Sequence, residues 1–280
     1  MSKQLIKNTD GLKVLSLFDG ISCGQLALHK ANVRCASYHA SEIDPSAISI
    51  TQRNFPDTIQ LGDVNHWRQW SVSPDLLLAG SPCQGFSQGG KGLNFRDERS
   101  KLFYSFVDAL NTLSPAYFLL ENTRMKPQWR DIISKELGVA PVLLNSSLVS
   151  AQNRERLYWT NIPFTTPLNR GIMLRDIVGP YEGIYVIPRG YNKGGVQSYK
   201  GKSPTITTSS WQHNFFISSA DGSRRRFTVN ECEQIQTLPL HYTAGVADTN
   251  RYKAIGNGWT VDLISHIFEG LKPQTEVPIY

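Results

Sequence analysis

The sequence predicts an open α/β fold built on a mostly parallel sheet. The main observation is that short apolar runs alternate with segments of helical periodicity over the first 160 residues. Strands that alternate with helices form βαβ units, whose strands lie parallel in one sheet. A second observation is that glycine, acidic residues or a cysteine follow directly after these runs. Ligands bind at the carboxyl ends of the strands in such sheets.

Each predicted element rests on a local pattern. Apolar runs predict strands at residues 14–18, 35–41, 76–79, 117–120, 142–149 and 156–161. Helices are predicted at 22–31, from Asp44-Pro45 onward, at 100–113 and at 129–137. Asp is a favourable N-cap and Pro suits the first helical position. Within 100–113 the apolar residues recur at helical spacing.

The alternation stops after residue 163. Residues 165–226 are rich in Gly, Ser, Thr and aromatic side chains, which favours short strands and loops. The spacing Thr228-x-x-Glu231 is a capping box ahead of a helix, and residues 260–271 predict a last amphipathic helix. We therefore expect an α/β domain at 1–163, a small β and loop region at 164–226, and a helical segment at 227–280 that returns to the first domain.

Composition excludes several classes of protein. A chain of 280 residues with 40% hydrophobic and 19% charged residues is neither a disordered tail nor a disulfide scaffold. The sequence has no apolar run near the ~18 residues of a membrane span and no signal-peptide core at its start. The four cysteines are too few and too scattered for a disulfide frame or a zinc cluster. We expect a cytoplasmic, nucleoid-associated protein with no metal and no membrane contact.

The positive charge is concentrated in one region. The chain carries 29 Lys and Arg against 23 Asp and Glu, a net charge of +6. Residues 165–226 hold nine of the basic and three of the acidic residues, so the rest of the chain is balanced. This distribution favours a polyanionic partner for residues 165–226. For any single lysine, a solvated loop charge is the alternative.

Three acidic or glycine-rich positions follow the first strands. The turn Phe18-Asp19-Gly20-Ile21-Ser22-Cys23-Gly24 leads into a helix, which lets a ligand approach the backbone. Glu42 lies 22 residues after Gly20, where an acidic residue takes ribose hydroxyls in such folds. Asp63 follows the third strand. The turn lacks a phosphate cradle, so an adenosine ligand fits better than a dinucleotide. The alternative is that Glu42 and Asp63 are helix caps.

Later strand ends carry groups for catalysis. Cys83 follows Pro82 after a strand and precedes a loop rich in glycine, a position typical of a nucleophile ahead of a mobile lid. Glu121 follows an apolar run and is a candidate acid. Gln152, Arg154 and Arg156 alternate, so on a strand they would share one face. Two arginines on one face form a surface salt-bridge ladder, or, where they face a cleft, hold an anion or a carbonyl group.

Six sequence blocks in this order resemble the DNA cytosine-5 methyltransferases that use S-adenosylmethionine. The blocks are Phe18-Asp19-Gly20, Ser41-Glu42-Ile43, Ser81-Pro82-Cys83-Gln84, Glu121-Asn122, Gln152-x-Arg154-x-Arg156 and Gly256-Asn257-Gly258. Residues 15–21, 149–151, 241–243 and Trp259 resemble the de novo branch of that family. The resemblance implies a Rossmann-like methyltransferase fold and a bacterial or phage origin.

The resemblance also implies roles for individual residues. Cys83 would attack C6 of a flipped-out cytosine, Glu121 would hydrogen-bond N3 and the amino group, Arg156 would hold O2 and Arg154 would brace the site. The cofactor residues would be Phe18, Asp19, Gly20, Ile21, Ser22, Cys23, Glu42, Ile43, Asp63, Val64, Pro82, Leu102, Asn257, Gly258 and Trp259. Residues 164–226 would recognise double-stranded DNA, and DNA contacts would come from Gln84, Ser87, Arg99, Lys193, Lys200, Lys202 and Trp211.

Two other functions compete with this interpretation. One is a tRNA cytosine-5 methyltransferase of the same fold, although the Cys-Phe-Thr triplet of that branch is absent. The other is a DNA-binding homologue without activity, which would not need an intact Cys83, Glu121, Arg154 and Arg156. The sequence leaves open the target sequence, the preference for hemimethylated sites, the choice between monomer and homodimer, and the biological setting.

Overall fold

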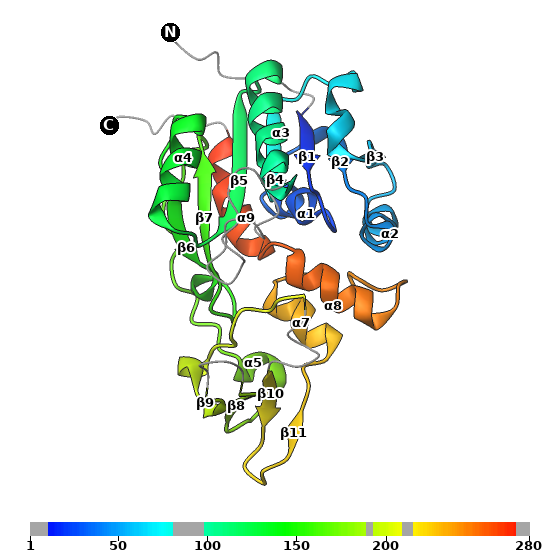
Figure 1. Ribbon diagram of the computed structural model, residues 1–280. Helices are drawn as coiled ribbons and strands as arrows, with labels where there is room; N and C mark the ends of the chain where they lie inside the picture. Colours follow the sequence, from blue (N-terminus) through cyan, green and yellow to red (C-terminus); the bar gives the residue numbers. More distant parts are fainter. Residues whose placement is uncertain (1–10, 81–97, 189–192, 209–214, 273–280) are drawn as a thin grey trace, which may run out of the picture.

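A seven-stranded sheet forms the larger part of the computed structural model, which describes residues 11–80, 98–188, 193–208 and 215–272. The strand order is β3-β2-β1-β4-β5-β7-β6 (Figure 1). The strands are β1 Leu12–Leu17, β2 Cys35–Ser41, β3 Ile59–Gln60, β4 Leu76–Gly80, β5 Tyr117–Thr123, β6 Val142–Asn145 and β7 Glu155–Thr160. The first five pair in parallel, whereas β7 runs antiparallel to both β5 and β6. The predicted α/β fold is confirmed.

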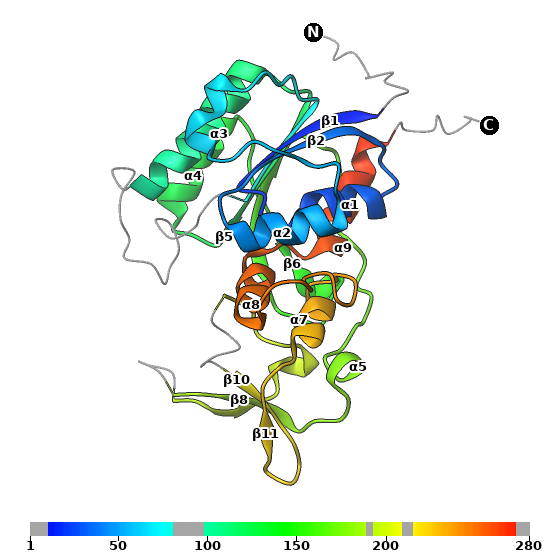
Figure 2. The same cartoon turned by 90° about the vertical axis from the view of Figure 1, so that its right-hand side faces the viewer.

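Helices cover both faces of this sheet (Figure 2). One buried apolar cluster joins inward residues of β1, such as Val14, to α1 Cys23–Lys30, α2 Pro45–Asn54 and α9 Val261–Phe268. The other joins Leu15 and Leu17 to α3 Glu98–Leu113 and α4 Pro127–Leu137. Because side chains alternate along a strand, the central strands β1, β4, β5 and β7 supply both clusters and are buried on both faces.

A second, antiparallel sheet lies below the first in Figure 1. Its order is β11-β10-β8-β9, from β8 Gly183–Val186, β9 Gly195–Gln197, β10 Phe215–Ser218 and β11 Arg224–Arg225. Helices α7 Val229–Ile235 and α8 Asp248–Asn257 lie between the two sheets, and the short α5 Arg175–Val178 accompanies the small one. The predicted capping box is present, with Thr228 and Glu231 each accepting a backbone N–H of the other.

Two element predictions need correction. The expected strand at 142–149 ends at Asn145, whose side chain accepts from the Ser147 N–H and starts a 3-10 turn. The expected strand at 117–120 continues to Thr123, because β7 pairs with it beyond the point where β4 ends. Glu121 and Asn122 therefore lie inside a strand. None of the described helices has the length and apolar character needed to cross a bilayer.

Candidate active site

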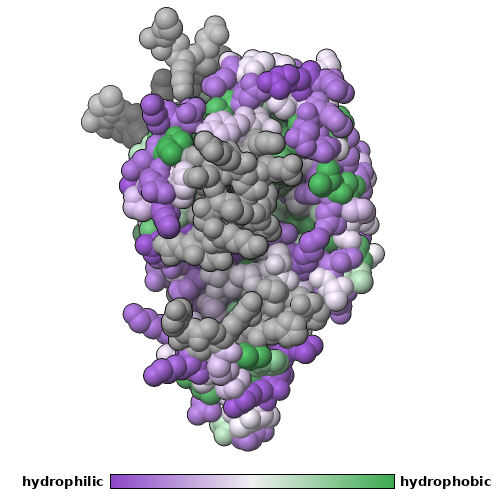
Figure 3. Space-filling model, in the orientation of Figure 1, coloured by the Kyte–Doolittle hydropathy of each residue, from purple (hydrophilic) through white to green (hydrophobic). Residues whose placement is uncertain are grey.

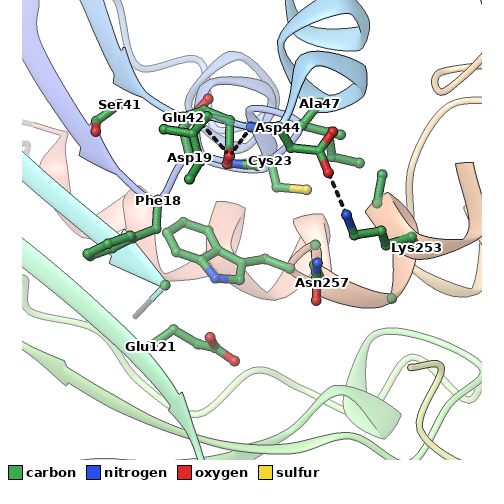
Figure 4. A pocket seen from close by; sticks show the side chains of 18 of the residues that line it. Phe18, Asp19, Cys23, Ser41, Glu42, Asp44, Ala47, Glu121, Lys253 and Asn257 are labelled. Atoms are coloured by element: carbon green, nitrogen blue, oxygen red, sulfur yellow. Dashed lines mark hydrogen bonds and ion pairs between the residues drawn. The ribbon is translucent and has the colours of Figure 1, made fainter. Parts of the chain in front are cut away.

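A cavity of about 510 Å³ opens where β1, β2, β4 and β5 end. Its size lies within the ~300–1,000 Å³ of small-molecule sites. Figure 4 shows the labelled side chains around it: the first two strand ends supply one side, α8 another, and Glu121 lies across from both. Among the lining residues are Phe18, Asp19, Gly20, Ile21, Cys23, Glu42, Ile43, Asp63, Val64, Leu102, Glu121, Arg154, Arg156, Asn257, Gly258 and Trp259.

The first wall is the turn between β1 and α1. Phe18, Gly20 and Ser22 all have left-handed backbone angles, with φ of 56°, 62° and 54°. Such angles strain residues with a side chain, and glycine adopts them freely. A Cβ on Gly20 would meet no atom within 4 Å, so the space beside it is open. Gly20 therefore gives the turn its shape and leaves room for a ligand.

Glu42 ties this turn to the end of β2. Its carboxylate accepts from the Gly20 N–H at 2.8 Å and from the Ile43 and Asp44 N–H groups at 2.7 and 2.9 Å. Glu42 does not cap α2, since the Asp44 carboxylate accepts from Ser46 N–H in that role. Asp63 does act as a cap, accepting from the Asn65 N–H at 2.9 Å, while it also lines the cavity.

Asp19 lies in the same turn and is half-buried. It accepts hydrogen bonds from the Tyr38 hydroxyl at 2.8 Å and from the Ser22 hydroxyl. Burial raises the pKa of Asp19 to about 6, although these hydrogen bonds oppose the shift. The neighbouring Cys23 is buried, and burial raises the pKa of its thiol to about 12. Cys23 is therefore a neutral wall residue and a poor nucleophile.

Glu121 and Arg156 form an ion pair on the opposite side. Arg156 Nε lies 3.0 Å from Glu121 Oε1, and the two side chains are only 13% and 11% exposed. They come from adjacent antiparallel strands, β7 and β5. The pair presents a carboxylate and a guanidinium together at the cavity, which suits a ligand edge with both a donor and an acceptor.

Arg154 has a different environment from Arg156. It is buried, and its guanidinium donates to the carbonyl oxygens of Ile206 at 2.9 Å, Gly258 at 3.0 Å and Gly256 at 3.4 Å. Burial lowers the pKa of Arg154 to about 10. Arg154 thus joins the small region to the end of α8.

The expectation that Gln152, Arg154 and Arg156 share one face of a strand is wrong. Strand β7 begins only at Glu155, so Gln152 and Arg154 lie before it. Gln152 is fully buried, and its amide donates to Gln236 Oε1 at 2.7 Å. Gln152 therefore supports the core between the two sheets and does not face the cavity.

The end of α8 and the residues that follow it close the cavity. A Cβ on Gly258 would lie 3.1 Å from Cys23 Sγ, and one on Gly80 would lie 2.9 Å from Trp259 Nε1. These close approaches bring Trp259 against the end of β4. Sequence reasoning missed three other α8 residues on the wall, Asn250, Lys253 and Ala254, because no helix was predicted there.

The structure tests few of the predicted DNA contacts. Pro82, Cys83, Gln84, Ser87 and Trp211 lie outside the described residues, as does the side chain of Arg99. Lys193 and Lys200 are exposed. At the lower end of the view in Figure 3, where the small sheet lies, hydrophilic side chains lie among smaller hydrophobic patches.

Lys202 is a correction to the predicted DNA contacts. It is only 9% exposed, and its ammonium donates to the carbonyl oxygens of Ser147 at 2.8 Å and Ser150 at 3.0 Å and to that of Ile172. A lysine enclosed by three carbonyls holds the chain together and does not reach a phosphate. In the part of the chain that the structure describes, no group of three His, Cys, Asp or Glu side chains is placed to hold a metal ion.

A mostly parallel sheet with an acidic pocket at its strand ends defines a Rossmann-like α/β fold. The sequence model of the C-5 cytosine-specific DNA methylases matches residues 12–170 and 173–273. The chain belongs to this family, and it is an enzyme of the DNA (cytosine-5-)-methyltransferase class.

Similar proteins agree with this assignment. The type II methyltransferase M1.ScrFI of Lactococcus lactis subsp. cremoris is 28% identical over 94% of this chain and 78% of its own length. The type II methyltransferase M.NlaX of Neisseria lactamica is 26% identical over 93% of this chain and 96% of its own length. Among solved structures, the methyltransferase EhMeth of Entamoeba histolytica has a TM-score of 0.70 at 16% identity, over 93% of this chain and 98% of its own. A DNMT2 variant of Spodoptera frugiperda has a TM-score of 0.67 at 20% identity, over 92% of this chain and 99% of its own.

Proposed function

We propose that this chain transfers a methyl group from S-adenosylmethionine to C5 of a cytosine in double-stranded DNA, through a covalent adduct on Cys83. The observation that carries the proposal is one continuous cavity with two chemically different ends. Glu42 and Asp63 line it near the first strands, and the Glu121–Arg156 pair lines it at β5 and β7. A methyl donor and an acceptor base would meet inside such a cavity.

The residues at the first strands fit S-adenosylmethionine. Carboxylates such as Glu42 accept hydrogen bonds from ribose hydroxyls, and Asp63 would accept from the adenine amino group. Ile43, whose side chain is 69% exposed beside the cavity, would cover the adenine ring. The open space at Gly20 and the aromatic wall of Trp259 would receive the rest of the ligand. When bound, this cofactor supplies an electrophilic methyl group on a sulfonium ion.

The Glu121–Arg156 pair suits the Watson–Crick edge of cytosine. C5 of cytosine is a weak nucleophile, and adding the Cys83 thiolate to C6 makes C5 electron-rich. The added electron density reaches N3, where Glu121 would donate or share a proton, while Arg156 would hold O2. After methylation at C5, a base removes the C5 proton, the C6–S bond breaks and the thiolate is restored.

The substrate proposal rests on access and charge. C5 and C6 of a stacked base are out of reach, so the target base has to leave the duplex. The net charge of +6 within residues 165–226 would attract the phosphate backbone, and Lys193 and Lys200 are exposed there. Type II methyltransferases among the relatives support DNA as the substrate.

Labelled methyl transfer tests the proposal. Purified enzyme with methyl-labelled S-adenosylmethionine would be given unmethylated double-stranded DNA or total tRNA, with Cys83→Ser as the control. We expect label in DNA only, and only with the intact cysteine. Label in tRNA alone would favour the tRNA methyltransferase, and no transfer to either would favour a homologue without activity.

A further inference from the structure

The cavity contains more negative than positive charge. Among the described residues that line it, five are acidic and three are basic: Asp19, Glu42, Asp44, Asp63 and Glu121 against Arg154, Arg156 and Lys253. A carboxylate that enters this cavity needs a hydrogen-bonding partner, and a cation is the strongest one, because an unpaired charge is costly to desolvate. The amino-acid group of S-adenosylmethionine has such a carboxylate beside its own ammonium. The question is which of the three cations would take it.

Two of the three cations are already engaged. Arg154 is 4% exposed, and its guanidinium nitrogens donate to backbone carbonyls. Arg156 is paired with Glu121 at 3.0 Å, in the place proposed for the target base. Moving either would break a buried arrangement, which is expensive.

Lys253 is held more loosely. Its Nζ lies 2.7 Å from Asp44 Oδ2, and the two side chains are 55% and 31% exposed. Exposed ion pairs of this kind contribute little, so exchanging the partner costs little. Asp44 keeps its structural role without the lysine, since its other oxygen accepts from the Ser46 N–H. In Figure 4, Lys253 extends from α8 toward Asp44, on the side of the cavity away from Glu121.

A second contact keeps α8 close to α2. The Asn250 amide donates to the Ser46 hydroxyl at 2.8 Å, one turn before Lys253 on the same helix. This bond holds the rim of the cavity in place while Lys253 changes partner. The lysine stem is flexible, so the ammonium can turn from Asp44 to a ligand within the cavity that both residues line.

We propose that Lys253 binds the carboxylate of the amino-acid group of S-adenosylmethionine by exchanging its ion pair with Asp44. The proposal rests on the function proposed above, because it assumes that this cofactor occupies the cavity. It assigns to α8 a selectivity for adenosyl ligands that carry an amino-acid group over those that lack one.

Two ligands separate this role from a general effect on the cavity. S-adenosylhomocysteine has the amino-acid group, and 5′-methylthioadenosine lacks it. Calorimetry on the purified full chain measures both affinities. Lys253→Met should weaken the binding of S-adenosylhomocysteine about tenfold, which corresponds to the loss of one charge-assisted hydrogen bond. The affinity for 5′-methylthioadenosine should stay within about twofold of wild type. Lys253→Arg should retain most of the affinity.

Two further variants complete the test. Asp44→Asn keeps a favourable N-cap but releases Lys253, so S-adenosylhomocysteine should bind equally well or more tightly. Lys30→Met is the matched control, since it removes a similar exposed pair, Lys30 with Asp262 at 2.5 Å, outside the lining of the cavity. It should change neither affinity.

The outcomes are distinct. Equal weakening of both ligands by Lys253→Met, or no weakening of either, would overturn the role of Lys253 while leaving the cofactor site in place. A wild-type chain that binds neither ligand would overturn the proposed function itself.

Discussion

Arg156 Nε lies 3.0 Å from Glu121 Oε1, and this ion pair lines the cavity at the ends of β5 and β7. The pair depends on the antiparallel register of β5 and β7, in which Thr123 lies opposite Arg156 and Glu121 opposite Tyr158. Each partner holds the other in place before a substrate arrives. Fixed charges of this kind stabilise a transition state without reorganising during the reaction.

Replacing Glu121 with Gln should strongly reduce turnover and leave cofactor binding unchanged. The amide keeps the size of the side chain but cannot deliver a proton to N3 of the base, so we expect a loss of about 10²–10⁴-fold in the rate of methyl transfer. Single-turnover kinetics measure the rate, and calorimetry with S-adenosylhomocysteine provides the control. A rate within a few-fold of wild type would remove Glu121 from the chemistry.

Replacing Glu42 with Ala should weaken the binding of S-adenosylmethionine by about 1–3 kcal/mol, because the ribose hydroxyls would lose their hydrogen-bond acceptor. The structure adds a complication, since Glu42 also accepts from the Gly20, Ile43 and Asp44 N–H groups. A ligand lacking the ribose hydroxyls separates the two effects. If the variant weakens that ligand equally, Glu42 acts only by shaping the turn.

Replacing Arg154 with Met should destabilise the fold by about 2–4 kcal/mol, because three carbonyl groups would lose a buried donor. Urea unfolding measures this change. Arg124→Met is the control: Arg124 also pairs with a carboxylate, Glu155 at 2.7 Å, but its side chain is 58% exposed. Its loss should cost less than about 1 kcal/mol. Equal effects of the two variants would contradict the joining role of Arg154.

Lysines in residues 164–226 should differ in their effect on DNA binding. Replacing the exposed Lys193 and Lys200 with Ala should lower the slope of log affinity against log salt by about one for each phosphate that is no longer neutralised. Lys202→Met should lower stability and leave that slope unchanged, because its ammonium is enclosed by carbonyls. Binding isotherms at several salt concentrations test this. A slope that responds to Lys202 and ignores the exposed lysines would reverse our assignment.

Asp19 should give stability a particular pH dependence. Its pKa is about 6 in the fold, above the ordinary value of 3.8, so the folded chain binds this proton more tightly than the unfolded chain. The contribution of Asp19 to the free energy of unfolding therefore falls by about 1–3 kcal/mol as the pH rises from about 4 to about 6, and it stays constant above pH 6. Relative to wild type, Asp19→Asn should gain stability across this range. A difference between the two that stays constant with pH would exclude this titration.

Sequence predicts the sheet well, because its strands depend on local patterns. Buried strands are short apolar runs. The spacing from Gly20 to Glu42 led us to expect an acidic residue at the end of β2, and the structure adds a 2.8 Å hydrogen bond from the Gly20 N–H to that carboxylate. The Asp44-Pro45 start of α2 also follows from local capping preferences.

Features set by distant contacts could not be predicted. Helix α8 buries only Ile255 and Gly256, so it has no apolar stripe to reveal it. Gly256 itself is required by a distant segment, since a Cβ there would lie 2.3 Å from the Thr207 backbone. Lys202 has the sequence context of a solvated loop residue, and only the arrangement of three remote carbonyls shows that it is enclosed.

Bisulfite sequencing of plasmid DNA from cells that express this chain tests the central claim most directly, beside cells that express the Cys83→Ser variant. We predict cytosines that resist bisulfite conversion in one short sequence context with the intact chain, and none with the variant. Complete conversion of the DNA from cells with the intact chain, or equal resistance with the variant, would contradict cytosine-5 methylation of DNA through Cys83.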